Sequence, residues 1–206
     1  MGHVLLFGGP NGAGKDTLER RFDESSPFSD RIVRHYTRAP HENEQDGVDY
    51  HFVSEQVFEG MIEEDDFLEH ASYVGCRSGT SRSEINSCLE RSPVSTLTAN
   101  YEDALTIKGK LDDESVPNTC LFVSPCSEEK LIDEPKLYLD ALRARMKSRG
   151  RTSDSIEGRL IKASEYRETY ISNPSNSVYI DNSTGEIESA LRNISQYVIS
   201  LGLERP

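Results

Sequence analysis

The chain has 206 residues, and its 36 Asp and Glu outnumber its 23 Lys and Arg to give a net charge of -13. This length suits one domain that buries about 70% of its unfolded surface. An acidic surface repels phosphate backbones and anionic lipids, so the charge argues against general binding of nucleic acid or membranes. The apolar run near the start, residues 4–7, is too short for a signal peptide or a membrane span, and we expect a cytoplasmic protein.

The first third of the chain predicts a strand, a loop and a helix, followed by a polar segment. Residues 3–8 indicate a short buried strand closed by glycines, and Leu18 and Phe22 lie one turn apart in the helix that follows. Two further strands are expected at 31–33 and 49–53, around a charged loop. Ser54 is a candidate N-cap for the next helix.

The rest of the chain continues to alternate strands with helices. A helix is expected at 83–90, and strands at 94–97 and 119–123 flank a helical segment at 101–111. Asp154 and Glu157 predict a capping box for a helix that runs to about 170, and a strand at 178–180 precedes an amphipathic helix at 187–201. This alternation predicts an α/β fold with a mostly parallel sheet flanked by helices.

The loop after the first strand, GGPNGAGKDT at 8–17, predicts a phosphate site. It matches the pattern G-x-x-x-x-G-K-[ST] except at Asp16, where a hydroxyl is usual. Glycines let the backbone N–H groups turn inward around an anion, and Lys15 adds a positive charge at the helix N-terminus. The alternative is a chance glycine-rich turn, which the preceding strand and following helix disfavour. The predicted nucleotide-binding residues here are Gly9, Asn11, Gly12, Ala13, Gly14, Lys15, Asp16 and Thr17.

Asp16 and Thr17 are the candidate metal ligands. A hydroxyl at the position of Asp16 would bind the magnesium ion that bridges the nucleotide phosphates. A carboxylate is a stronger magnesium ligand but brings a negative charge beside the triphosphate, so we expect altered metal geometry with the metal retained. Asp16 as a first-turn residue that complements the helix dipole is the structural alternative.

Later segments narrow the class of nucleotide-binding protein. They are TRAP at 37–40, DGVDYHFV at 46–53, FLEH at 67–70, GTS at 79–81, LRARMKSRG at 142–150, and Ile156 with Arg159-Leu160. Their succession over essentially the whole chain resembles the guanylate kinases. The resemblance implies a P-loop NTPase fold that is one domain, with a core at about 1–33, 94–141 and 172–206, a small acceptor-binding lobe at about 34–93 and a mobile lid at about 142–171.

The resemblance also implies the activity and the roles of individual residues. It implies an ATP-dependent kinase that uses Mg²⁺ and phosphorylates a small acceptor, GMP by default, as a monomer or homodimer. The catalytic residues would be Lys15, Arg145, Arg149 and Arg159, and Asn182 would join the nucleotide site. The acceptor would contact Arg34, Arg38, Tyr50, Glu69, Ser78, Thr80, Thr98 and Asn100, with Arg38 and Tyr50 on its phosphate and Glu69 on a guanine edge.

The lid arginines also point to a phosphate site on their own. Arg145 and Arg149 lie one turn apart, where like charges repel unless an anion binds both. Residues 143–167 hold eight basic and three acidic side chains in an otherwise acidic chain. The alternative is a solvated basic helix face.

Departures from the family pattern leave other functions open. His41 stands where the family has a second phosphate-binding arginine, Ser78 replaces a tyrosine, and Thr98 and Asn100 replace two aspartates. The G-K-D loop with Arg34 four residues before Arg38 resembles ribose 1,5-bisphosphate phosphokinases. A catalytically inactive binding module of guanylate-kinase shape is the third possibility.

Overall fold

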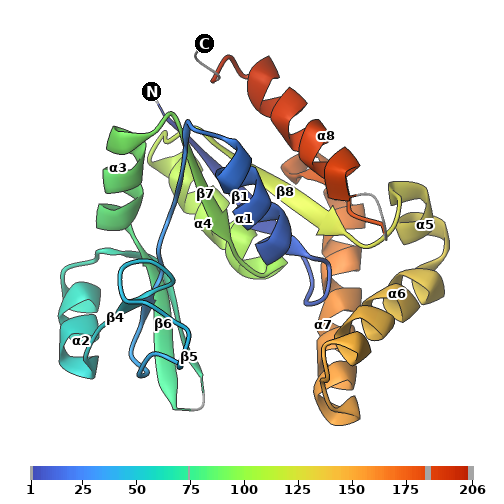
Figure 1. Cartoon of the computed structure of the whole chain (residues 1–206), viewed down its shortest axis with the longest axis horizontal. Helices are drawn as coiled ribbons and strands as arrows, with labels where there is room; N and C mark the ends of the chain where they lie inside the picture. The colour runs from blue at the N-terminus through green and yellow to red at the C-terminus, as the bar shows by residue number, and fades with distance from the viewer. Residues whose placement is uncertain (1, 74, 184–186, 204–206) are drawn as a thin grey trace.

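The computed structural model describes residues 2–73, 75–183 and 187–203, and it confirms the α/β fold (Figure 1). A five-stranded sheet with the order β2-β7-β1-β8-β9 lies at its centre. Its neighbouring strands all run parallel, as the sequence predicts. The strands are β1 (His3–Gly8), β2 (Ser29–Arg31), β7 (Val94–Thr98), β8 (Asn118–Ser124) and β9 (Val178–Asp181).

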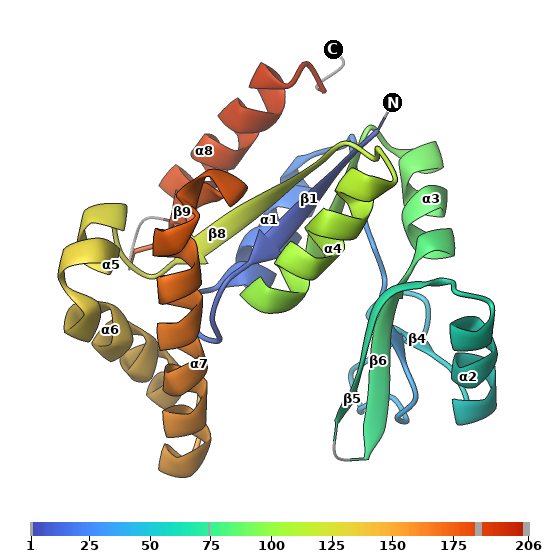
Figure 2. The same ribbon diagram turned by 180° about the vertical axis from the view of Figure 1, so that it is seen from behind.

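Helices cover both faces of this sheet (Figures 1 and 2). The side chains of residues 4–7 on β1 are fully buried, because this central strand is covered on both sides. Helices α1 (Lys15–Ser25) and α8 (Ile187–Ser200) lie together on one face, and α4 (Tyr101–Asp113) lies on the other. The phosphate loop between β1 and α1 therefore opens at the carboxyl edge of the sheet, where α/β folds bind ligands.

A second, four-stranded sheet with the order β4-β3-β6-β5 builds a separate lobe. Its elements are β3 (His35–Tyr36), β4 (His51–Phe52), β5 (Phe67–Tyr73) and β6 (Cys76–Ser81), with α2 (Glu55–Glu63) beside them and α3 (Arg82–Arg91) leading back to the core. The predicted N-cap at Ser54 is confirmed, since its hydroxyl accepts a hydrogen bond from the amide of Val57 at 3.2 Å.

The strands predicted at 31–33 and 49–53 are wrong in extent. Arg31 ends β2, and the chain then crosses from the central sheet to the lobe, so only residues 35–36 pair again. The second strand is limited to residues 51–52, because its short partner β3 offers only two residues for pairing. Strand periodicity in the sequence does not reveal where a chain changes sheets.

The third part of the structure is a helical arm. It contains α5 (Glu128–Asp133), α6 (Pro135–Ser148) and α7 (Ser153–Ser172), followed by a 3-10 turn, η1 (Pro174–Asn176). The predicted capping box of Asp154 and Glu157 is wrong, because the N-cap of α7 is Thr152, two residues before Asp154, and it makes no side-chain cap hydrogen bond. The ring of Tyr170 stacks on Phe122 of β8 at 4.6 Å, which ties the last turn of α7 to the core.

No helix in the described part of the chain has the length and apolar character needed to cross a membrane.

Candidate active site

The loop at 9–14 has the backbone shape that its glycines predict. Gly9 has φ 145°, and a Cβ there would lie 2.5 Å from the backbone oxygen of Val123. Gly14 is left-handed at φ 96° and ends the loop where α1 begins. Because a side chain would clash at Gly9 and be strained at Gly14, glycine is required at both positions.

Lys15 is the first residue of α1 and is only 7% exposed. Burial lowers the pKa of its ammonium group, whereas the charges of Asp16 and Glu19 raise that pKa. A buried cation at a helix N-terminus is favourable when an anion binds beside it. Lys15 thus has the placement expected for contact with nucleotide phosphates.

The side chains of Arg145 and Asn182 bind the backbone of the phosphate loop at 9–14. Nη1 of Arg145 donates to the carbonyl oxygens of Ala13 at 3.1 Å and Gly12 at 3.5 Å, and Nη2 donates to the carbonyl of Asn182. The side-chain amide of Asn182 donates to the same carbonyl of Ala13 at 2.7 Å. The predicted nearness of Asn182 to the loop is therefore observed, and Arg145 contacts the loop backbone.

Arg149, the other half of the predicted anion pair, lies at the exposed end of α6. Burial and the charge of Arg149 lower the pKa of Arg145. The two cations therefore still affect each other electrostatically, but Arg145 is satisfied by backbone carbonyls.

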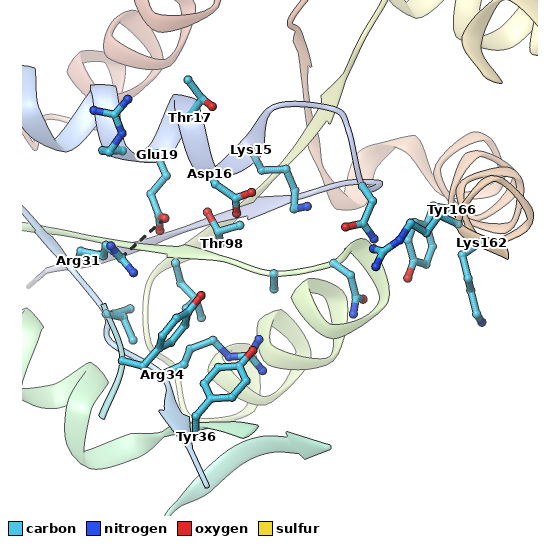
Figure 3. Close-up of a pocket in the computed structure, with 18 of the residues that line it drawn as sticks. Lys15, Asp16, Thr17, Glu19, Arg31, Arg34, Tyr36, Thr98, Lys162 and Tyr166 are labelled. Atoms are coloured by element: carbon cyan, nitrogen blue, oxygen red, sulfur yellow. Dashed lines mark ion pairs between the residues drawn. The ribbon is translucent and has the colours of Figure 1, made fainter. Parts of the chain in front are cut away.

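A cavity of about 680 Å³ extends from the loop to the second lobe (Figure 3). Its walls come from α1, β2, β7, the lobe and α7. The residues are Asn11, Lys15, Asp16, Thr17, Glu19, Arg20, Arg31, Ile32, Arg34, Tyr36, Tyr50, Leu97, Thr98, Ala99, Asn100, Gly158, Arg159, Lys162 and Tyr166. One cavity thus joins the phosphate loop to the predicted acceptor lobe, as transfer between two bound molecules requires.

Nine predicted site residues line this cavity: Asn11, Lys15, Asp16, Thr17, Arg34, Tyr50, Thr98, Asn100 and Arg159. Figure 3 shows Lys15 and Asp16 directed from α1 toward the side where Arg34 and Tyr36 lie, with Thr17 on the opposite side of the helix. The predicted residues Arg38, Glu69, Ser78, Thr80, Arg145, Arg149 and Asn182 are not among its lining residues, nor are the glycines and Ala13 of the loop.

The sequence prediction missed Glu19, which is 5% exposed in the cavity wall. Burial raises the pKa of Glu19 to about 7, against the opposing effects of Thr98 and Arg31. Its Oε2 lies 4.0 Å from Nε of Arg31, which was also missed (Figure 3). The spacing in the sequence could have predicted Glu19 as a site residue, because it follows Asp16 by three positions and therefore lies on the same face of α1.

Lys162 and Tyr166 of α7 were also missed, and they line the cavity with Arg159. Burial, followed by the charge of Arg151, lowers the pKa of Arg159. Residues 159, 162 and 166 recur at helical spacing, which would have placed them on one face of α7.

At the lobe end of the cavity, Arg34 forms an ion pair with Glu69. The hydroxyl of Thr80 also donates to Oε1 of Glu69 at 3.2 Å. Glu69 is 8% exposed, and Ser78 and Thr80 are fully buried. Arg34 is a lining residue of the cavity, whereas Glu69, which the sequence assigns to base recognition, is not among the lining residues.

Arg38 lies beside this end but pairs outside the cavity wall. Its guanidinium donates to both carboxylate oxygens of Glu44, at 2.6 and 2.8 Å. It also lies over the rings of Tyr36, Tyr50 and Phe52, at 5.0, 5.5 and 5.3 Å from their centroids. Both Nη atoms of Arg38 are therefore engaged by Glu44 in this structure.

Comparison with known proteins places this geometry in a family. The guanylate kinase family model matches residues 1–198. A guanylate kinase of Thiobacillus denitrificans is 33% identical over 165 residues, covering 80% of this chain and 72% of that protein. One of Clostridium perfringens is 31% identical over 201 residues, covering 97% and 83%.

A solved structure agrees with the sequence relatives. The crystal structure of guanylate kinase from Anaplasma phagocytophilum superimposes with a TM-score of 0.64 at 20% identity, covering 98% of this chain and 87% of that one. At 20% sequence identity the superposition supports only the fold of this chain. The assignment to a family rests on the family model and the sequence relatives. With its phosphate loop, second lobe and connecting cavity, the chain belongs to the guanylate kinase family of ATP-dependent kinases.

Proposed function

We propose that the protein transfers the γ-phosphoryl group of ATP to GMP and releases ADP and GDP. The observation that carries this proposal is the single cavity of about 680 Å³ that joins Lys15 to Arg34 and Tyr50. Relatives that match most of the chain are named guanylate kinases, which supports GMP as the acceptor.

The donor phosphates bind at the loop. Inward-facing backbone N–H groups and the N-terminus of α1 supply partial positive charge, and Lys15 supplies a full one. Arg145 and Asn182 fix the loop through its carbonyl oxygens, so the N–H groups are held in place before the nucleotide arrives. A preorganised site of this kind stabilises charge as it develops, without reorganisation during the reaction.

The acceptor binds between the lobe and β7. The phenol of Tyr50 lines the cavity and donates to the acceptor phosphate, while Arg159 approaches from α7 across the cavity. Because the acceptor phosphate is already anionic, the reaction needs alignment and charge neutralisation more than a general base. Movement of α6 and α7 toward the lobe would exclude water from the transferring group.

The residues present also fit a magnesium ion. Asp16 places a hard oxygen donor in the cavity wall next to Lys15, and Mg²⁺ prefers such ligands, whereas Thr17 lies on the opposite side of α1 and stays a predicted ligand. When bound, the ion neutralises charge on the donor phosphates. Asp16 would hold it as a carboxylate in place of the usual hydroxyl.

The other two functions receive less support. A sugar bisphosphate acceptor needs Arg34 as an extra positive charge, but its guanidinium is paired with Glu69. A catalytically inactive module would have no need of both Lys15 and Arg159 in the wall of one cavity.

The direct test is release of ADP from magnesium-ATP in the presence of GMP. Lys15→Ala should lower kcat by about a hundredfold or more, the cost of losing one preorganised charge on the transferring group. Lys136→Ala removes an exposed lysine of α6 and should leave the rate unchanged. Equal rates for the wild type and Lys15→Ala would contradict the proposed role of Lys15.

A further inference from the structure

At the lobe end of the cavity, Arg34 is a lining residue and a hydrogen-bond donor. An acceptor such as a carboxylate would be needed there to accept hydrogen bonds from the amino group of a base. Arg34 lines the cavity, and Glu69 lies behind it in an ion pair. Oε1 of Glu69 also accepts from Thr80. A bound base at this end therefore meets the donors of Arg34 before it meets the carboxylate.

Asn100, a further polar residue of the cavity wall, is engaged by the helix that follows it. Its Oδ1 caps α4 by accepting from the amide of Asp103 at 2.9 Å, and its Nδ2 donates to the Asp103 carboxylate at 2.6 Å. Asp103 is itself partly buried, and burial followed by the charge of Glu69 raises its pKa. Both side-chain groups of Asn100 thus have partners without a ligand.

The acidic residues among the described cavity-lining set are Asp16 and Glu19. Both belong to α1, on the phosphate side (Figure 3). Within the described cavity wall, the lobe end therefore provides cationic donors and no carboxylate.

Purine bases differ in the groups they present to such a wall. Guanine and hypoxanthine both carry the O6 and N7 acceptors, which are the atoms that an arginine side chain reads in guanine. Adenine has an amino donor in place of O6. Guanine alone among these three carries the 2-amino donor, which is recognised by an acceptor oxygen of a carboxylate, an amide or a hydroxyl group.

We propose that Arg34 is a specificity-determining residue that selects 6-oxopurine nucleoside monophosphates through their O6 and N7 atoms, with no strong requirement for the 2-amino group. IMP is then an acceptor comparable to GMP, and AMP is a poor one. This inference rests on the proposed function, because it assigns the base specificity of the same transfer site.

The ion pair also favours a neutral base over a second phosphate at this position. Arg34 and Glu69 together carry no net charge. The pair can therefore form hydrogen bonds with a neutral base but attracts a phosphate dianion only weakly. Discrimination by hydrogen bonding is large only when the wrong ligand leaves a buried group without a partner. Glu69 and Asn100 already have partners, so the loss of the 2-amino group should cost little.

The experiment compares kcat/KM for GMP, IMP and AMP with magnesium-ATP, together with binding of each nucleotide by calorimetry. For the wild type we expect GMP and IMP to agree within about tenfold, and AMP to be lower than IMP by about tenfold to a hundredfold. A GMP preference over IMP of about a thousandfold would overturn the inference. Equal values for IMP and AMP would do so as well.

A double variant, Arg34→Met with Glu69→Gln, removes both charges together and avoids a stranded buried carboxylate. It should bring IMP and AMP to within about threefold of each other, while an unchanged ratio in the folded variant would exclude Arg34 as the selecting group. Arg77→Met is the matched control, since Arg77 pairs with Glu59 on the lobe surface and is not a lining residue.

The binding measurement separates the two proposals. Comparable binding of GMP and IMP without phosphoryl transfer would contradict the proposed function and keep the assignment of the base site. Transfer to GMP with negligible binding of IMP would keep the function and overturn this inference.

Discussion

Arg145 and Asn182 bind the same backbone oxygen, the carbonyl of Ala13, at 3.1 and 2.7 Å. Two side chains from α6 and from the segment after β9 therefore meet at the loop, and Arg145 also donates to the carbonyl of Asn182. The relationship explains why the half-buried Arg145 has no ion pair with an acidic side chain among the residues that the structure describes. Its charge is matched by the dipoles of the carbonyl groups of Gly12, Ala13 and Asn182.

Arg145→Met should destabilise the fold and weaken nucleotide binding together. Loss of charge-assisted hydrogen bonds to buried carbonyls costs about 2 kcal/mol, and a looser loop should raise the KM for ATP. Urea unfolding and steady-state kinetics measure the two effects. Arg143→Met, which removes surface pairs with Asp140 and Glu157 on the same helix, should change stability by less than about 0.5 kcal/mol. If both variants behaved alike, Arg145 would have no special structural role.

Gly9→Ala and Gly109→Ala should have opposite effects on stability. A Cβ at Gly9 would lie 2.5 Å from a backbone oxygen, which cannot move without shifting β8, so we expect a loss of at least about 2 kcal/mol. No atom of the described residues lies within 4 Å of a Cβ at Gly109, inside α4, where alanine should add about 0.5–1 kcal/mol. Chemical denaturation of both variants measures the difference. A stabilising effect at residue 9 would mean that the loop has another conformation.

Asp16→Ser and Asp16→Asn test the unusual residue of the phosphate loop. Asp16 is exposed in the cavity wall, where its carboxylate is available to a magnesium ion. Both changes remove a charged ligand, so we expect each variant to need several-fold more free Mg²⁺ for half-maximal rate. Activity measured against free Mg²⁺ at saturating substrates checks this. The same magnesium dependence in the wild type and both variants would leave Asp16 with only its helix-dipole role.

Stability should decrease as the pH falls below about 6.5, in part because of His35. Burial, followed by the charge of His51, lowers the pKa of His35 from 6.5 to about 4, so the folded protein binds its proton less readily than the unfolded chain. The difference between those two values corresponds to at most about 3 kcal/mol, lost between pH 6.5 and 4. This stability is fully present above pH 6.5, where the side chain is neutral in both states.

His35→Phe should flatten that part of the stability curve, because it keeps an aromatic ring against Phe67 and removes the titrating nitrogen atoms. His41→Gln, at an exposed position, should leave the slope as it is in the wild type. The measurement is urea unfolding at a series of pH values from 4 to 8. A slope in His35→Phe as steep as that of the wild type would assign the pH dependence to other groups.

Local patterns predicted the elements that local physics controls. Three features could be predicted from a few neighbouring residues each. They are the buried strand residues 4–7, the glycines and lysine of the phosphate loop, and the apolar face of α8. Family motifs then located nine residues of the cavity wall, from Asn11 to Arg159. The predicted roles of Arg38, Glu69 and Arg149 stay predictions, because these residues lie outside that wall in the described structure.

What the sequence by itself determined was therefore the α/β class, the phosphate loop and the family. Only the tertiary structure decided which side chains pair. Glu69 meets Arg34 across 35 positions of the chain, Arg145 meets Ala13 across 132, and Glu19 faces Arg31 from another element. The physical reason is that burial and long-range hydrogen bonds depend on how separate elements pack. Periodicity within one element reports its exposed and buried faces but not its partners.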